Sequence, residues 1–214
     1  MPAAIWAGRN ATAEQAAADL TAALGAELGL ALPPLATALP AGSTGVPAGS
    51  LLPPRARFSG MPAPTHCFLY VDATAPRRFE LRAGVLSGRA GLRRSLGLGP
   101  LLYAVPLATA PVPAAVELSA PGGAAPARFT GDPATADRLN HDSGLTDAAR
   151  ALTPTTAGPD RNHTWQVARR LVIEPLPEGA VLLVQTLHRP TARGWSPGAA
   201  AVLDFAGRVE ACLG

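Results

Sequence analysis

All eighteen basic residues of this 214-residue chain are arginines, and its fifteen carboxylates leave a formal net charge of +3 at neutral pH. The absence of lysine excludes the phosphate-binding P-loop, the strand lysine of protein kinases, a Schiff-base lysine for pyridoxal phosphate, and Ser-Lys hydrolases. Alanine, glycine, proline and arginine are abundant and have GC-rich codons, so the composition predicts a bacterial protein from a GC-rich genome.

The cysteines and the apolar stretches indicate the cellular compartment in which the protein is expected. Cys67 and Cys212 are too few for a disulfide framework, so we expect two free thiols, with one long-range disulfide as the alternative for an exported chain. The chain does not open on a basic segment followed by an apolar run, and four prolines interrupt the uncharged stretch at residues 95–116. We therefore expect a soluble, cytoplasmic protein.

The chain divides into three parts. Residues 12–28 are predicted to form a helix, because their leucines recur every four residues and Gly29 is a natural stop. Residues 33–64 hold eight prolines and are predicted to be a linker or long loop. We expect an N-terminal helix (1–32), this linker, and an α+β core (65–214), forming one domain overall.

Short strands are predicted in the first half of the core. An apolar run marks residues 66–71, and residues 78–82 alternate between polar and apolar side chains. The alternation predicts a half-exposed antiparallel strand with its polar face in water. Residues 84–99 hold five glycines among three arginines and are predicted to be a flexible basic loop. Further strands are expected at 101–107 and 114–118.

The second half of the core is predicted to hold three helices and a hairpin. Asp132 suits an N-cap and opens a short helix that ends near residue 139, and a second short helix covers residues 145–152. Residues 165–173 and 180–187 are predicted to pair as a hairpin. The C-terminal helix starts after a Ser196 cap. The predicted fold class is α+β: an antiparallel or mixed sheet with an N-terminal helix, short middle helices, and a C-terminal amphipathic helix packed on it.

The positive charge is concentrated in one stretch. Between Arg55 and Arg94 there are eight arginines and two carboxylates. Guanidinium groups bind phosphates and carboxylates bidentately, so this stretch predicts contact with an acidic protein, a nucleic acid or an anionic membrane surface. The alternative is a solvated basic face without a ligand. The candidate binding residues are Arg77, Arg78, Arg82, Arg89, Arg93 and Arg94.

A catalytic alternative rests on three residues. Asp132, His141 and Ser143 include the side-chain types of a small hydrolase. Catalytic triads are assembled from distant segments, however, and helix capping by Asp142 or Ser143 also explains why these residue types occur here. The four histidines are dispersed, and no metal-ligand spacing or dinucleotide fingerprint is present. The sequence therefore favours a non-catalytic interaction domain without cofactor or metal over a hydrolase.

One segment carries a resemblance. Residues 129–139 read Phe-Thr-Gly-Asp-Pro-Ala-Thr-Ala-Asp-Arg-Leu, which resembles a segment of uncharacterised proteins from GC-rich bacteria. In those proteins a T-G-D-P turn leads into a short helix with a second aspartate, followed by strands and a C-terminal helix. Here the second aspartate comes one residue later, and the separate membrane helices that those proteins often carry are missing. The resemblance implies a related fold over the C-terminal part and no particular activity.

Overall fold

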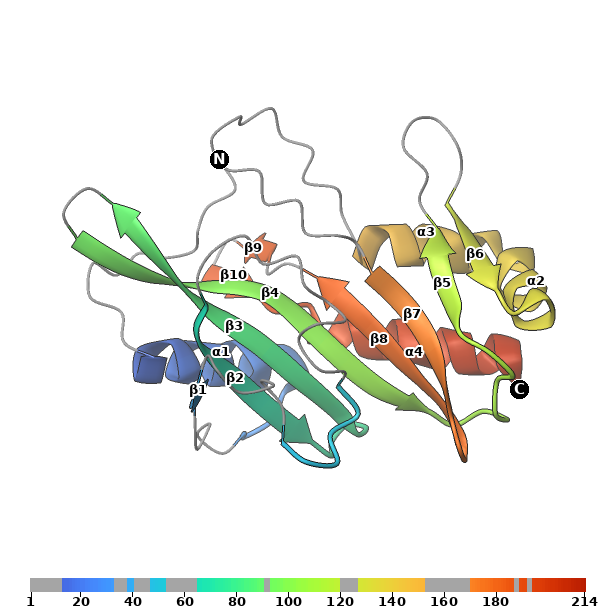
Figure 1. Ribbon diagram of the computed structural model, residues 1–214, viewed down its shortest axis with the longest axis horizontal. Helices are drawn as coiled ribbons and strands as arrows, with labels where there is room; N and C mark the ends of the chain where they lie inside the picture. Colours follow the sequence, from blue (N-terminus) through green and yellow to red (C-terminus); the bar gives the residue numbers. More distant parts are fainter. Residues whose placement is uncertain are drawn as a thin grey trace.

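The computed structural model (Figure 1) describes residues 13–32, 38–40, 47–52, 65–90, 93–119, 127–152, 170–186, 189–191 and 194–214. The helices of this part of the chain are α1 (Ala13–Leu28), α2 (Pro133–His141), α3 (Ser143–Leu152) and α4 (Ala199–Leu213). Its strands are β1 (Ala38–Pro40), β2 (Thr65–Ala73), β3 (Phe79–Ala90), β4 (Arg93–Leu107), β5 (Val116–Ser119), β6 (Arg128–Gly131), β7 (Arg170–Leu176), β8 (Gly179–Thr186), β9 (Arg189–Thr191) and β10 (Gly194–Ser196).

Eight strands form one sheet in the order β1-β2-β3-β4-β8-β7-β5-β6, and each paired neighbour is antiparallel. Strands β9 and β10 form a separate antiparallel pair. Strand β8 is buried along its whole length, as its apolar residues on both faces predict for a central strand. The α+β class is confirmed, and the sheet is of the antiparallel type.

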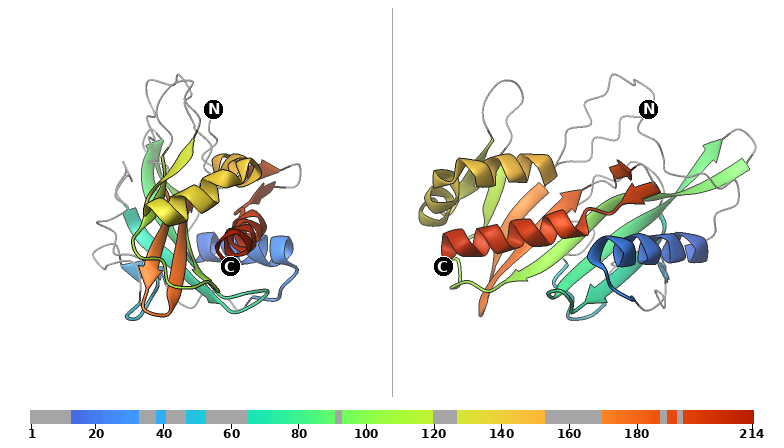
Figure 2. Two further views of the ribbon diagram at one scale, coloured as in Figure 1. Left: turned by 90° about the vertical axis from the view of Figure 1, so that its right-hand side faces the viewer. Right: turned by 180° about the vertical axis from the view of Figure 1, so that it is seen from behind.

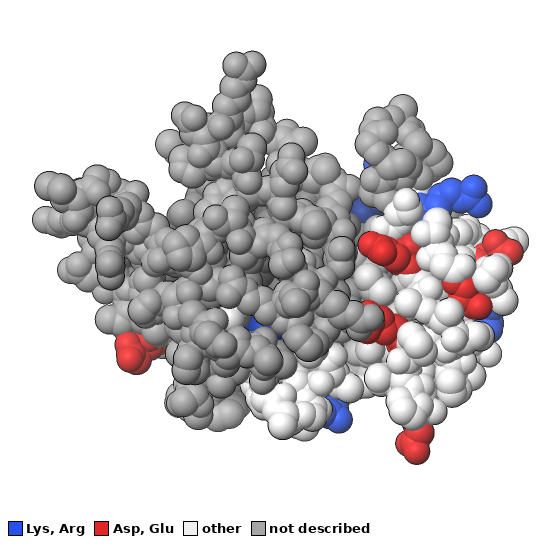
Figure 3. Space-filling model, viewed as in Figure 1, with Lys and Arg blue, Asp and Glu red and all other residues white. Residues whose placement is uncertain are grey.

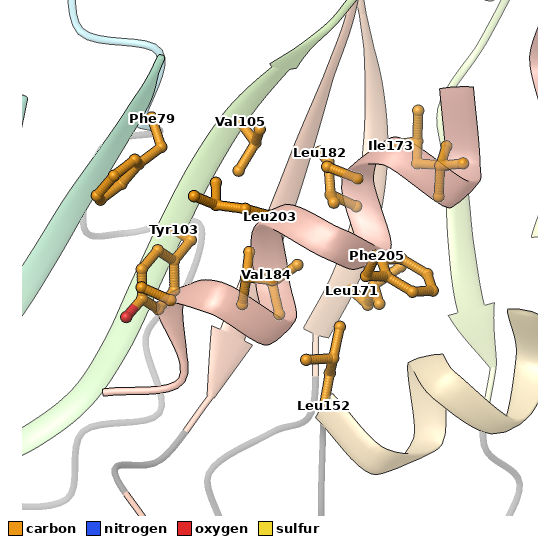
Figure 4. Close-up of a cluster of buried hydrophobic side chains, with 14 of the residues drawn as sticks. Phe79, Tyr103, Val105, Leu152, Leu171, Ile173, Leu182, Val184, Leu203 and Phe205 are labelled. Carbon is orange, nitrogen blue, oxygen red and sulfur yellow. The ribbon is translucent and has the colours of Figure 1, made fainter. Parts of the chain in front are cut away.

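All four helices lie on one face of the sheet (Figure 2). The main core fills the space between them and the strands. Phe79 and Tyr103 from β3 and β4 share this core with Leu203 and Phe205 from α4 and with Leu152 of α3 (Figure 4). Because alternate strand residues point to one face, the sheet contributes every second side chain to this layer.

The opposite face of the sheet, called here the second face, carries a smaller apolar cluster: Leu52, Leu102, Ala104, Val172, Val181 and Leu183. It also holds buried polar side chains. Glu80 and Arg82 of β3 are only 1% and 3% exposed. The prediction that the polar side of this strand lies in water is therefore wrong at Glu80 and Arg82, because Ser50 and Leu51 lie against Glu80 and Arg82 packs on the Phe68 ring.

The glycine-rich segment of residues 84–99 also departs from expectation. It was predicted to be a flexible loop, but β3 runs on to Ala90 and β4 begins at Arg93, so the segment is a long hairpin. Its backbone pairs from Val85↔Leu98 to Ala90↔Arg93 in continuous register. Glycine weakens a strand, but ladder hydrogen bonds to a neighbour override this local preference.

The helix ends follow local chemistry. Gly29, with φ at +67°, ends α1 as predicted, and Thr12, the first residue of the predicted helix, lies outside the described residues. Asp132 is the N-cap of α2, with Pro133 in the first turn. Gly131 before it has φ at +128°, and a Cβ there would lie 2.2 Å from the carbonyl oxygen of Ala115. The T-G-D-P turn thus needs its glycine for steric reasons.

The three-part division of the chain is only partly visible. Within the predicted linker of residues 33–64, strand β1 pairs with β2, and residues 47–52 lie on the second face. The remainder of that linker lies outside the described residues. Among the helices described, none combines the length and apolar character needed to cross a membrane.

Candidate functional site

The six candidate arginines fall into two groups in the structure. Arg77 lies in the turn between β2 and β3 and donates two hydrogen bonds to the carboxylate of Glu210 on α4, at 3.0 and 2.6 Å. It donates a third, at 2.8 Å, to the carbonyl of Pro106 at the end of β4. Glu210 accepts a further bond, of 2.6 Å, from the N–H of Ala108. Arg77 therefore joins the last helix to the sheet.

Arg78 and Arg82 also have partners within the protein. Arg78 is half-exposed and lies 3.4 Å from Glu80 and 4.0 Å from Asp72. Arg82 is 3% exposed, and its guanidinium carbon lies 5.5 Å from the centre of the Phe68 ring, which is cation–π geometry. A guanidinium buried in this way is not available to a large anionic surface.

The other three candidates share one place. Arg89 and Arg94 are direct register partners near the end of the β3–β4 hairpin, and Arg93 is the partner of Ala90. Directly opposed residues of an antiparallel pair have Cα atoms about 4.5–5.5 Å apart, so the three backbone positions are close together. Figure 1 shows this end of the hairpin extending beyond the other strands at one extremity of the molecule. We call these three residues the hairpin arginines.

The charged residues in the sequence of the hairpin beyond Glu80 are all positive. Between Glu80 and Glu117 the sequence contains Arg82 and the hairpin arginines but no carboxylate. The opposite end of the molecule, formed by α2, β5 and β6, bears both acidic and basic side chains (Figure 3). Its exposed charges include Glu117, Arg128, Asp137 and Arg138.

The candidate hydrolase residues have structural roles or face solvent. Asp132 accepts hydrogen bonds from the N–H and the hydroxyl of Thr135, at 2.9 and 2.7 Å. These bonds hold the pKa of Asp132 below its ordinary value. Asp142 accepts from the N–H of Leu145 at 3.1 Å, so capping of α3 by Asp142 is confirmed. His141 and Ser143 are exposed. The segment therefore acts as two consecutive helix caps.

Neither metal ligands nor a disulfide emerge near these residues. The described side chains include no group of three His, Cys, Asp or Glu that could hold a metal ion. Cys212 is a free, half-buried thiol 3.9 Å from Asp142. Burial and the neighbouring Asp142 raise its pKa, so at neutral pH it is a protonated thiol of low nucleophilicity.

Comparison with protein families, with curated proteins and with solved structures found no match. Function has to be inferred from the residues and their geometry.

Three polar side chains that the sequence did not single out organise the structure. Glu27 at the end of α1 bonds to the start of α4, Glu80 bonds to residues 50 and 51, and Asn140 of α2 bonds to β6. Each bonds to a partner that is remote in sequence or on another element, so no local sequence pattern reveals the contact. For Glu80 the available signal was its place as one of two carboxylates inside an arginine-rich stretch.

Proposed function

We propose that this protein is a non-catalytic interaction domain that binds an acidic protein surface through the hairpin arginines. The observation that carries the proposal is the division of the arginine-rich stretch. Arg77 and Arg82 are engaged within the fold and Arg78 is paired at its edge, and the backbone positions of Arg89, Arg93 and Arg94 lie together at the projecting end of a hairpin. Cytoplasmic location and bacterial origin, expected from the sequence, belong to the same proposal.

The small number of arginines at the end of the hairpin favours a protein as the partner. Three arginines near a membrane contribute about 1 kcal/mol each, and stable anchoring takes a second signal as well. Proteins whose DNA binding depends steeply on salt make about 6–10 phosphate contacts, and single-strand binders add aromatic stacking. Residues 80–102 contain no Phe, Trp or Tyr. A small cluster of guanidinium groups suits a local patch of carboxylates, which each can bind bidentately.

The test compares two triple variants with the same change in net charge. The first replaces Arg89, Arg93 and Arg94 with Gln, and the second replaces Arg128, Arg138 and Arg150 at the other end of the molecule. Fluorescence anisotropy with a labelled oligo-glutamate peptide across a salt series should show binding that weakens as salt rises. The hairpin variant should bind roughly tenfold to a hundredfold more weakly, and the control variant should bind almost as the wild type does.

Equal loss in both variants would mean that only net charge matters and would overturn the proposal. Tighter binding to a DNA duplex, or to phosphatidylserine vesicles, than to the peptide would assign the hairpin to another class of partner.

A further inference from the structure

The second face of the sheet contains a carboxylate in an apolar setting. Glu80 is 1% exposed, and its register partner on β4 is Ala104, a member of the apolar cluster on that face. Moving a carboxylate out of water is costly unless hydrogen bonds replace its hydration. The donors to Glu80 therefore decide what this residue does.

Two donors come from residues 47–52, far away in sequence, and a third is Arg78, whose Nη2 donates to Oε1 of Glu80 at 3.4 Å. The hydroxyl of Ser50 donates to Oε2 of Glu80, and the N–H of Leu51 lies 3.2 and 3.0 Å from the two carboxylate oxygens. Ser50 Oγ in turn accepts the N–H of Leu52 at 3.1 Å. The Glu80 carboxylate therefore binds polar groups of this short segment, either directly or through Ser50. We call residues 47–52 the strap.

The strap also makes apolar contacts with the second face. Leu52 is 3% exposed and belongs to the cluster with Leu102, Ala104, Val172, Val181 and Leu183, and Leu51 packs against its margin. Residues 47–49 are exposed, and the strap itself makes no strand pairing. Among the described residues, the contacts of the strap with the sheet are made by the Glu80 carboxylate and by Leu51 and Leu52, and the strap can leave without breaking the ladder of the sheet.

We infer that Glu80 is a latch, and that the strap opens and closes over the second face as the latch is released and made. Opening frees the Glu80 carboxylate and withdraws Leu52 from the aliphatic cluster, while β3 and β4 stay paired. Arg78, 3.4 Å from Glu80, is the half-exposed cation beside the latch. The inference is independent of the hairpin arginines.

Hydrogen exchange of backbone amides tests the latch. Glu80→Gln keeps the shape of the side chain but removes its charge, and Ser50→Ala removes one donor while leaving Glu80 in place. Exchange at Leu51 and Leu52 should become about tenfold faster or more in Glu80→Gln, because a bond to a charged acceptor is weakened. Ser50→Ala should accelerate the same amides. The matched control is Glu117→Gln, which alters an exposed glutamate of β5 and should leave the strap unchanged.

Tyr70 provides a second readout beside the latch. Burial, then the charge and hydrogen bond of Glu80, raise the pKa of Tyr70 to about 12, with Asp72 adding to the rise and Ser50 opposing it. In Glu80→Gln the tyrosinate absorbance of Tyr70 should appear at lower pH than in the wild type. Unchanged exchange at Leu51 and Leu52 in both variants would overturn the inference. So would exchange that rises equally in the strap, β3 and β4, because Glu80 would then support the sheet as a whole.

Discussion

The carboxylate of Glu27, at the end of α1, accepts a hydrogen bond of 2.9 Å from the N–H of Ala200 in the first turn of α4. It accepts two more from Ser196 Oγ and Gly198 N–H, at 2.8 and 3.1 Å. The N-cap residue of α4 is Gly198, which has no side chain to cap with, and the predicted Ser196 cap lies outside the helix. The first helix of the chain therefore caps the last one, and the negative charge is at the favourable end of the α4 dipole.

Replacing Glu27 with Ala should destabilise the fold by about 1–2 kcal/mol, the usual cost of losing a helix cap. The free energy of unfolding in urea measures this. Asp204→Asn, an exposed acidic position on α4, is the control for charge and should change stability by less than about 0.5 kcal/mol. Equal effects of the two substitutions would argue against a capping role.

The Arg77–Glu210 pair should control stability in acid. Burial by itself raises the pKa of Glu210, but the hydrogen bonds from Arg77 and from the Ala108 N–H outweigh burial and hold the pKa below its ordinary value of 4.5. A carboxyl whose pKa is lower in the folded state stabilises the protein above its unfolded pKa. That contribution is lost as the pH falls through the folded value. Arg77→Met should remove about 2 kcal/mol at neutral pH, and its deficit relative to the wild type should shrink as the pH falls below 4.5, because the wild type then loses the contribution of Glu210.

Urea unfolding between neutral pH and pH ~3 measures both effects. Arg150→Met is the matched control, because its ion pair with Asp147 is 3.8 Å long and both side chains are largely exposed. Such pairs contribute little, so we expect a change below about 0.5 kcal/mol. An Arg77 variant as stable as the control at every pH would contradict the proposed role of the pair.

Asn140 should protect the edge of the sheet. Its side-chain amide accepts from the N–H of Phe129 at 2.8 Å and donates to the carbonyl of Phe129 at 2.9 Å, as a neighbouring strand would. Strand β6 is the last of the sheet, so these groups of Phe129 would otherwise be free to pair with another chain. Asn140→Leu should cost about 2 kcal/mol and promote self-association.

Size-exclusion chromatography with light scattering detects the association, and amide exchange at Phe129 reports the lost bond. Asn140→Asp keeps an acceptor for the N–H but loses the donor, so we expect an intermediate effect. A monomeric Asn140→Leu variant with wild-type exchange at Phe129 would exclude a role at the edge.

Local sequence determined much of the fold. The repeat of leucines in α1, the Asp132–Pro133 start of α2 and the apolar β8 each act within a few residues, so the α+β class and most elements follow from the chain alone. The hairpin of residues 84–99 did not follow, because its glycines favour a loop until a neighbouring strand supplies hydrogen bonds.

Only the tertiary structure decided which of the charges are engaged within the fold. The sequence identified six arginines in one stretch, but it could not show that Arg77 binds Glu210, 133 residues away, or that Arg82 is buried. The same holds for Glu80, paired 30 residues back with Ser50, and for Glu27, 173 residues from Ala200. The sequence around a charged side chain does not indicate a distant partner. Whether it is buried and paired or exposed depends on which surfaces the sheet and its helices bring together.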